Sequence, residues 1–462
     1  MTKIYPILLL GLFSQINGQA QTMPLKEAIE MGINNYGKLK AENRYVKAST
    51  AQIEVAKRAY LPEVNLSAQQ SYGTINGQNG PSMGFGGLGV ASSGQPLEEQ
   101  NWKAAFGALY LVNVNWNFFN FGRIDQQVRV ANAEAKQRTK NYEQEVFQQQ
   151  VKIAAAYLNL LASQRLQHTQ QRNLDRLVQF QQNVDSRVAG GLLPGVDGTT
   201  AAAEVAKAKI TLNQIKDRVS QSNNELISLL GIRDAQVQTD TLFLAEIPHG
   251  DWQEQLEATK KVHPSLAFLT SKIEQSKEQE TFLKKEALPS FHLLGIYQAR
   301  ASGFENTYGT NPAAYSQNYF KGVGPTRQNY LVGVGAVFNL TGLGTSSKKL
   351  QAQQFLTDGL QEEWSAIDTE IHNRVDGARK SYVFALQNYN EAPLQVLAAR
   401  QAYTQRLALY NNGLNELIDV TNAQYLLNRA EMDRDIAYTN LWQALLMVAA
   451  SKGDFELFIN EF

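Results

Sequence analysis

Residues 61–66 of the chain read Leu61-Pro62-Glu63-Val64-Asn65-Leu66, and residues 288–293 repeat the pattern as Leu288-Pro289-Ser290-Phe291-His292-Leu293. In the first copy a proline ends a run of helix-forming residues, and apolar and polar residues then alternate. This pattern predicts a helix followed by a β-strand. The two copies lie 227 positions apart, which indicates that the chain is built from two related halves.

Two further landmarks keep the same order at nearly the same spacing. Tyr110-Leu111-Val112 recurs as Tyr330-Leu331-Val332, 220 positions later, and Gly191-Leu192 with Asp197 recurs as Gly413-Leu414 with Asp419, 222 positions later. We therefore predict two repeats, over residues 21–230 and 252–450, with a linker over 231–251 and a C-terminal segment over 451–462.

Each repeat reads as a helix, a β-hairpin, a very long helix and a further helix. Pro24 favours the start of the first helix, which we expect to end near Tyr60. The loops of the two hairpins, at 73–100 and about 299–328, are rich in the small and polar residues that form turns. The other predicted elements are a hairpin over 63–119 and helices over 123–188 and 199–230, and then a hairpin over 290–340 and helices over 346–411 and 417–450.

These elements predict an α+β fold. The long helix over 123–188 would extend roughly 100 Å at about 1.5 Å per residue, which exceeds a compact domain. Four strands cannot close a barrel alone, because about eight are needed. The strands therefore form either a small open sheet or one part of a sheet that several chains share.

The composition argues against a nucleic-acid-binding protein and indicates an exported chain. The 462 residues include 43 Lys plus Arg and 43 Asp plus Glu, so no net charge favours nucleic acid as a partner. Lys3, the apolar run 4–13 and the small residues ending at Ala20 predict a secretory signal peptide over residues 1–20. The chain has no Cys, so it cannot form a disulfide or carry the lipid of a bacterial lipoprotein.

We do not expect an enzyme, a cofactor or a metal site. Residues 84–89 fit the dinucleotide-binding pattern G-x-G-x-x-G, and residues 80–84 fit the hydrolase pattern G-x-S-x-G. Both patterns need a preceding strand and a following helix, whereas these lie inside one glycine-rich loop. The five His are scattered without the spacing of metal ligands.

Aromatic residues gather where the first hairpin ends. Trp116, Phe118 and Phe119 lie at the end of an alternating strand. This position favours a girdle at a membrane interface, and an ordinary core cluster is the alternative.

Taken together, these landmarks resemble the TolC-type outer-membrane efflux protein family, over the whole chain after the signal peptide. The resemblance is carried by four features. They are the helix from Leu25 that ends at Leu61-Pro62, the second Leu288-Pro289, the junction Trp116-Asn117-Phe118-Phe119-Asn120-Phe121-Gly122, and the turns at Gly191–Asp197 and Gly413–Val420.

The resemblance implies a homotrimer in the outer membrane of a Gram-negative bacterium. Each chain would give four strands to a twelve-stranded β-barrel in outer-membrane lipid, which continues into a long periplasmic α-helical barrel. Members are passive ducts that work with a periplasmic adaptor and an inner-membrane transporter of the RND or ABC type. A structural, envelope-spanning helical protein without a transport role is the alternative function.

The resemblance also implies roles for the two turns. Gly191, Leu192, Gly413 and Leu414 match the periplasmic tips that meet the adaptor. Asp197 and Tyr410 match a pair that closes the pore, and Asp419 matches an acid that lines it. Asn415 stands where well-known relatives have a closing arginine. For Asp197 and Asp419, the alternative role is as N-caps of the helices that follow.

Overall fold

The computed structural model of the chain describes residues 22–77, 96–241, 247–248 and 261–461. The expected signal peptide lies outside these residues, as do parts of the first hairpin loop and of the linker. The chain divides into two compact units. We call Met1–Lys47, Lys136–Lys272 and Leu360–Phe462 the helical unit, and Ala48–Ala135 and Ile273–Gly359 the sheet unit.

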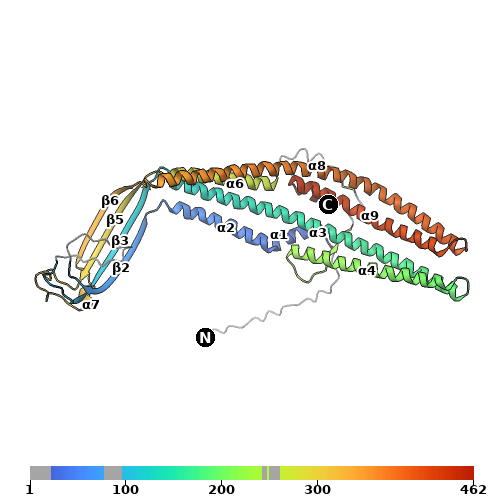
Figure 1. Ribbon diagram of the computed structural model, residues 1–462, viewed down its shortest axis with the longest axis horizontal. Helices are drawn as coiled ribbons and strands as arrows, with labels where there is room; N and C mark the ends of the chain where they lie inside the picture. The colour runs from blue at the N-terminus through green and yellow to red at the C-terminus, as the bar shows by residue number, and fades with distance from the viewer. Residues whose placement is uncertain (1–21, 78–95, 242–246, 249–260, 462) are drawn as a thin grey trace, which may run out of the picture. The chain divides into compact units, whose positions relative to one another are not determined.

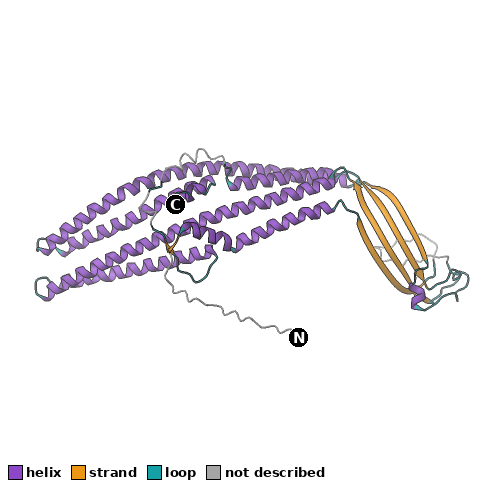
Figure 2. Cartoon of the chain, turned by 180° about the vertical axis from the view of Figure 1, so that it is seen from behind, coloured by secondary structure: helices purple, strands orange, loops and turns teal. Residues whose placement is uncertain are grey.

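The sheet unit contains an antiparallel sheet, drawn in orange in Figure 2, and Figure 1 labels its strands in the order β2-β3-β5-β6. Its strands are β2 (Glu63–Thr74), β3 (Ala104–Phe119), β5 (Ser290–Ser302) and β6 (Arg327–Val337). The two hairpins lie side by side because β3 pairs with β5. The short helix α7 (Tyr319–Val323) lies in the second hairpin loop.

Most of the chain is helical. Among the described residues, the helices that lie wholly within the helical unit are α1 (Leu25–Asn35), α4 (Gly195–Leu230), α9 (Leu417–Lys452) and α10 (Glu456–Ile459). The remaining helices are α2 (Gly37–Arg58), α3 (Arg123–Ala189), α6 (Pro264–Glu286) and α8 (Gly342–Asn411), and α8 runs unbroken through Pro393. Among the described residues, no helix is both long enough and apolar enough to cross a membrane.

The observed boundaries differ from the expected ones at several points. The first helix breaks at Tyr36, which has extended backbone (φ −63°, ψ 119°) and lies between Asn35 and Gly37, both weak helix formers. The helix expected over 199–230 begins at Gly195, because Pro194 already presets the backbone before the first turn. The second hairpin loop is shorter than 299–328, since β5 continues to Ser302 and β6 begins at Arg327.

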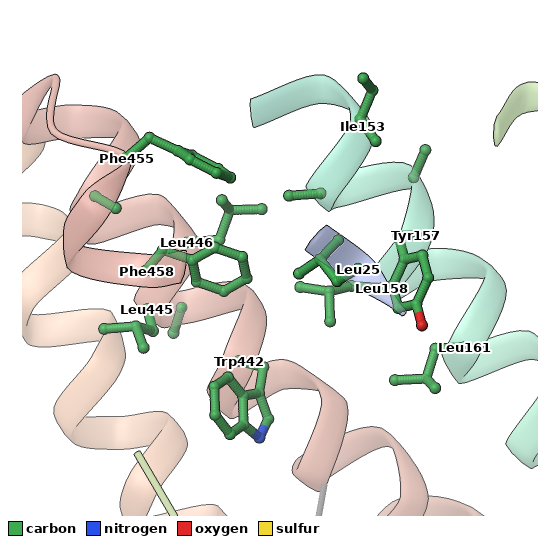
Figure 3. Packing of buried hydrophobic residues seen from close by; sticks show 14 of the residues in the cluster. Leu25, Ile153, Tyr157, Leu158, Leu161, Trp442, Leu445, Leu446, Phe455 and Phe458 are labelled. Atoms are coloured by element: carbon green, nitrogen blue, oxygen red, sulfur yellow. The ribbon is translucent and has the colours of Figure 1, made fainter. Parts of the chain in front are cut away.

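The core of the helical unit joins α1, α3 and α9 to the C-terminal segment (Figure 3). Trp442, Tyr157, Leu158 and Phe458 are among its largest fully buried side chains. The Tyr157 hydroxyl donates to the backbone oxygen of Met23 at 2.7 Å and accepts from the backbone nitrogen of Asp240 at 2.8 Å. Burial raises the pKa of Tyr157 to about 12, so the phenol stays neutral.

The hydrogen bonds of Tyr157 stabilise a small parallel pairing beside this core. Strand β1 (Thr22–Met23) pairs with β4 (Gln238–Thr239). Because Tyr157 bonds Met23 in one strand and the residue after Thr239, it holds the start of the first repeat against the segment that follows α4.

Candidate functional site

The two turns that join the long helices to the next ones have the same backbone structure. Gly191 (φ +72°) follows α3, and Gly413 (φ +73°) follows α8. The backbone nitrogen of Leu192 donates to the oxygen of Arg187, and that of Leu414 to the oxygen of Leu409, both at 2.9 Å. Each turn is therefore a Schellman motif, in which the left-handed residue is normally glycine.

In both turns, the residue after the glycine points into solvent. Leu192 is 73% exposed and Leu414 is 72% exposed, although a Schellman motif commonly packs this side chain on its own helix. Val196 and Ile418, in the first turns of the following helices α4 and α9, are also exposed. We call Leu192, Val196, Leu414 and Ile418 the apolar tip.

Val196 and Ile418 were missed by the sequence reasoning. They lie 222 positions apart, the same offset that relates the two glycines, so the repeat could have shown them.

A small core brings the two turns together. Val184 and Ala201 from the first repeat pack with Tyr410, Leu417 and Val420 from the second. Figure 1 shows the α3–α4 turn and the α8–α9 turn at the same end of the helical unit. The apolar tip therefore lies at this one end of the helical unit, with two of its exposed side chains on each turn.

The structure places Tyr410 and Asp197 in contact. The Tyr410 hydroxyl donates to Oδ2 of Asp197 at 3.4 Å, the long end of the hydrogen-bond range. Phe180 packs against the Tyr410 ring at 5.8 Å between centroids, and the Arg187 guanidinium lies 5.5 Å from the ring centre. Burial raises the pKa of Tyr410, as does the Asp197 charge, while Arg187 opposes the shift.

The N-cap alternative for the two aspartates was wrong. The residues at the N-cap positions are Pro194 and Glu416, and neither side chain caps its helix. Asp197 and Asp419 instead lie in the first turns of α4 and α9, where the positive end of the helix dipole stabilises a negative charge. The Asp197 carboxylate is thus positioned to accept from Tyr410.

An arginine does reach the turn that carries Asn415. Arg406, on the last part of α8, donates from Nη1 to Oδ1 of Asn415 at 3.4 Å. The sequence shows no arginine at position 415 itself, and it gave no sign that Arg406 would contact this position. Two cations therefore lie beside expected gate residues: Arg187 packs against Tyr410, and Arg406 donates to Asn415.

Charged side chains are also buried between α3 and α9. Glu431, 3% exposed, accepts from Arg176 at 2.7 Å and from Arg400 at 3.4 Å. Asp435, 2% exposed, accepts from Thr169 at 2.5 Å and from Arg434 at 2.9 Å. Because a buried charge that loses its partner is costly, the contacts with Arg176 and Thr169, which both lie on α3, fix the register of α9 along α3.

The two faces of the sheet differ in chemistry. Residues that are paired across antiparallel strands point to the same side, so the register sorts the side chains. One side, which we call the apolar face, carries Val64, Leu66, Val112, Val114, Trp116, Leu293, Tyr297, Tyr330, Val332 and Val334. The other side is mixed and includes Glu63, Asn65, Ser67, Gln69, Asn113, Asn115, His292, Gln298 and Asn329, with Leu109, Leu111, Leu294, Ile296 and Leu331.

A β-bulge gathers the expected girdle residues on the apolar face. Trp116 pairs with Leu293, and the register then shifts so that Phe119 pairs with Phe291. Trp116 and Phe119 therefore share a face, and the Phe118 ring lies 6.4 Å from that of Trp116. All three are exposed in the single chain, and the Trp116 indole donates to the backbone oxygen of Tyr60 at 2.9 Å.

The described residues contain no group of three or more His, Cys, Asp or Glu side chains that could hold a metal ion. The residues that the sequence singled out instead fall into two groups. The turn and gate residues lie together in the helical unit, and the aromatic residues lie on the apolar face of the sheet unit.

Residues 29–232 match the family described as outer membrane efflux protein. No curated protein matches the sequence. Among solved structures, the chain is similar to the outer-membrane channel OprN (16% identity, TM-score 0.72, 93% of this chain and 89% of that one) and to the CmeC outer membrane channel of Campylobacter jejuni (14%, 0.74, 93% and 85%). It is also similar to the open state of the MtrE outer membrane channel of Neisseria gonorrhoeae (15%, 0.69, 93% and 89%). The chain is therefore similar to the outer membrane efflux protein family over residues 29–232, and it has the fold of outer-membrane channels.

Proposed function

We propose that three copies of this chain form a passive exit duct through the outer membrane of a Gram-negative bacterium. An inner-membrane transporter of the RND or ABC type would supply the cargo through a periplasmic adaptor. The sheet carries this proposal, because it has an apolar face, a mixed face and two outer strands, β2 and β6, that pair on one side only within the described residues.

Closing the sheet explains its composition. A free sheet edge recruits further strands, and three copies of four strands give twelve, above the minimum of about eight for a closed barrel. The apolar face would contact lipid and the mixed face would line the lumen. From Trp116 to Phe106 is ten residues, about 34 Å along a strand at roughly 3.4 Å per residue, which a tilt of about 40° reduces to about 26 Å. This height matches the apolar band of outer-membrane barrels, about 25 Å.

The alternative, a structural helical protein without a transport role, leaves the sheet unexplained. Such a protein has no need for a sheet with one apolar face and one mixed face. A mass measurement in detergent and a conductance measurement in planar bilayers separate the two functions. We expect a trimer with stable single-channel currents, and a monodisperse monomer that still conducts would contradict the proposal.

The apolar tip is the surface that we propose for the adaptor. Apolar side chains that stay exposed in a repeated pattern mark a binding surface. Burying an exposed Leu contributes about 1.5–3 kcal/mol. The four tip residues, present in three copies, therefore suffice for a specific contact.

Introducing charge at the apolar tip is expected to abolish export. Leu192→Asp with Leu414→Asp places two carboxylates where apolar contacts are needed, and both positions are too exposed to affect folding. We expect at least about tenfold less crosslinked adaptor, since each lost Leu contact weakens binding by about 1.5–3 kcal/mol. Leu192→Met with Leu414→Met is the matched control. An unchanged adaptor yield in the charged variant would place the adaptor contact elsewhere.

The contact between Tyr410 and Asp197 is expected to be insensitive to pH over the ordinary range. The raised pKa of Tyr410 means that the folded chain favours the neutral phenol. The contact is therefore fully formed below the ordinary pKa of tyrosine, about 10, and it is lost as the pH rises through the raised pKa of Tyr410. We expect the conductance ratio of Tyr410→Phe to wild type to stay constant from about pH 6 to about pH 9.5. A ratio that changes near neutral pH would assign the contact to another titrating group.

A further inference from the structure

The helix α7 packs on the apolar face of the sheet, not on the mixed face. The Tyr110 hydroxyl, on strand β3, donates to the backbone oxygen of Val323 at 3.1 Å. The Tyr319 hydroxyl donates to Oε1 of Gln70 on β2 at 2.8 Å. Gly322 is pressed so closely against Phe106 that a side chain there would clash. Tyr110, Gln70 and Phe106 all lie on the apolar face by the strand register.

This position is one end of the apolar face. Phe106 pairs with Tyr72 near one end of β2 and β3, and Trp116 lies ten residues away, near the other end of β3. A continuous series of ring contacts links Tyr72, Phe106, Tyr319 and Phe320, with centroids 4.7, 5.2 and 5.4 Å apart. The apolar face thus ends in aromatic residues on both sides, and α7 supplies two of them.

The need to hold the hairpin loop on the sheet explains only the side of α7 that faces the sheet. Tyr319 and Gly322 hold the helix on the sheet, but Phe320 is 80% exposed. The neighbouring Lys321 is exposed and forms no ion pair within the described part of the chain. An exposed phenylalanine next to an unpaired lysine, at the edge of an apolar surface, is the composition of a segment at a membrane interface.

We propose that α7 is a membrane-contacting foot on the outer wall of the barrel. Phe320 lies in the interfacial region of the outer leaflet, and the Lys321 ammonium binds the phosphate groups of anionic lipids there. This inference rests on the proposed barrel, since only a lipid-facing apolar face places α7 against the membrane.

Single-cysteine spin labelling tests the foot directly, because the chain has no Cys to remove. Phe320→Cys reports on α7, Val332→Cys reports on the apolar face of β6, and Thr310→Cys reports on the exposed hairpin loop. In reconstituted trimers, collisions of each label with oxygen and with a water-soluble nickel chelate distinguish lipid from water. We expect the nickel collision rate at position 320 to be at least about threefold lower than at position 310, as for an interfacial residue.

The pattern of results separates the foot from the barrel. If position 332 is in lipid but position 320 is as accessible to nickel as position 310, the foot is overturned and the barrel stands. If position 332 is also fully accessible to nickel, the proposed duct itself fails, and the foot fails with it. Trimer yield, measured on all three variants, verifies that each has folded.

A charge substitution tests the role of the lysine. In vesicles with anionic lipid, the label at position 320 should be about twofold less accessible to nickel than in neutral vesicles, as interfacial binding to anionic lipid predicts. Lys321→Gln should remove this difference while position 332 stays in lipid. A difference that persists in Lys321→Gln would contradict the assigned role of Lys321.

Discussion

Removing residues 455–462 is expected to prevent the chain from folding. Phe455, Leu457 and Phe458 are buried in the main core of the helical unit, against α9 and α3. Lys261 also donates to Asp454 at 3.1 Å and to Glu456 at 2.5 Å, which ties this segment to the residues just before α6. Deletion would expose the apolar surface of α9 around Leu446 (Figure 3). It would also remove the packing of the three buried side chains and the bond to Glu456, and only the bond between Lys261 and Asp454 would remain.

A single substitution in this segment should lower the stability of the fold without abolishing it. Phe458 has no exposed surface, so Phe458→Ala leaves a cavity and should lower the free energy of unfolding by about 3–5 kcal/mol. The urea midpoint in detergent and the temperature at which the proposed trimer dissociates would both fall. Asn460→Ala is the control, because Asn460 is exposed on the same segment. Equal midpoints for the two variants would mean that the segment is an appendage and not part of the core.

The two turns could be predicted from the sequence because their geometry requires particular residues. A left-handed residue at the end of a helix is usually glycine, so Gly191 and Gly413 mark both turns by themselves. Their recurrence at one offset then predicts a shared structure, which the identical hydrogen bonds at Leu192 and Leu414 confirm.

The buried charges could not be predicted, because they depend on which helices meet. Glu431 and Asp435 are separated by one helical turn on α9 and would ordinarily form a solvated face. Their partners Arg176 and Arg165 lie more than 250 residues earlier, on α3. No local pattern in the sequence relates these positions.

The packing of α7 was missed for a similar reason. The glycine-rich and polar composition of the second hairpin loop predicted an unpacked connection, but Gly322 permits a close approach to Phe106 that no larger residue would allow. The two residues come from different repeats. Tertiary contact therefore overrides local composition in this loop.

Weakening the contact between Tyr410 and Asp197 is expected to open the proposed duct. The contact joins α8 to α4 inside the small core below the apolar tip, so it resists separation of the two turns. Because the hydrogen bond is long, at 3.4 Å, we expect a net contribution in the range of a neutral hydrogen bond, about 0.5–1.5 kcal/mol. Three symmetry copies would then contribute about 1.5–4.5 kcal/mol to closure.

The double variant Tyr410→Phe with Asp197→Ala should therefore raise the ratio of open to closed channels by about tenfold or more, since about 1.4 kcal/mol is a factor of ten. Single-channel recording and antibiotic leakage into cells measure this change, and the trimer yield should stay at the wild-type level. Tyr403→Phe is the matched control, because it removes a hydroxyl from the same helix seven residues earlier, beside the same small core. Asp419→Asn should leave the open ratio unchanged but weaken block by multivalent cations, because a ring of acids at a narrow mouth concentrates them. If the double variant conducts like wild type and loses trimer instead, Tyr410 and Asp197 stabilise the packing of the two turns, and the closing contacts lie elsewhere.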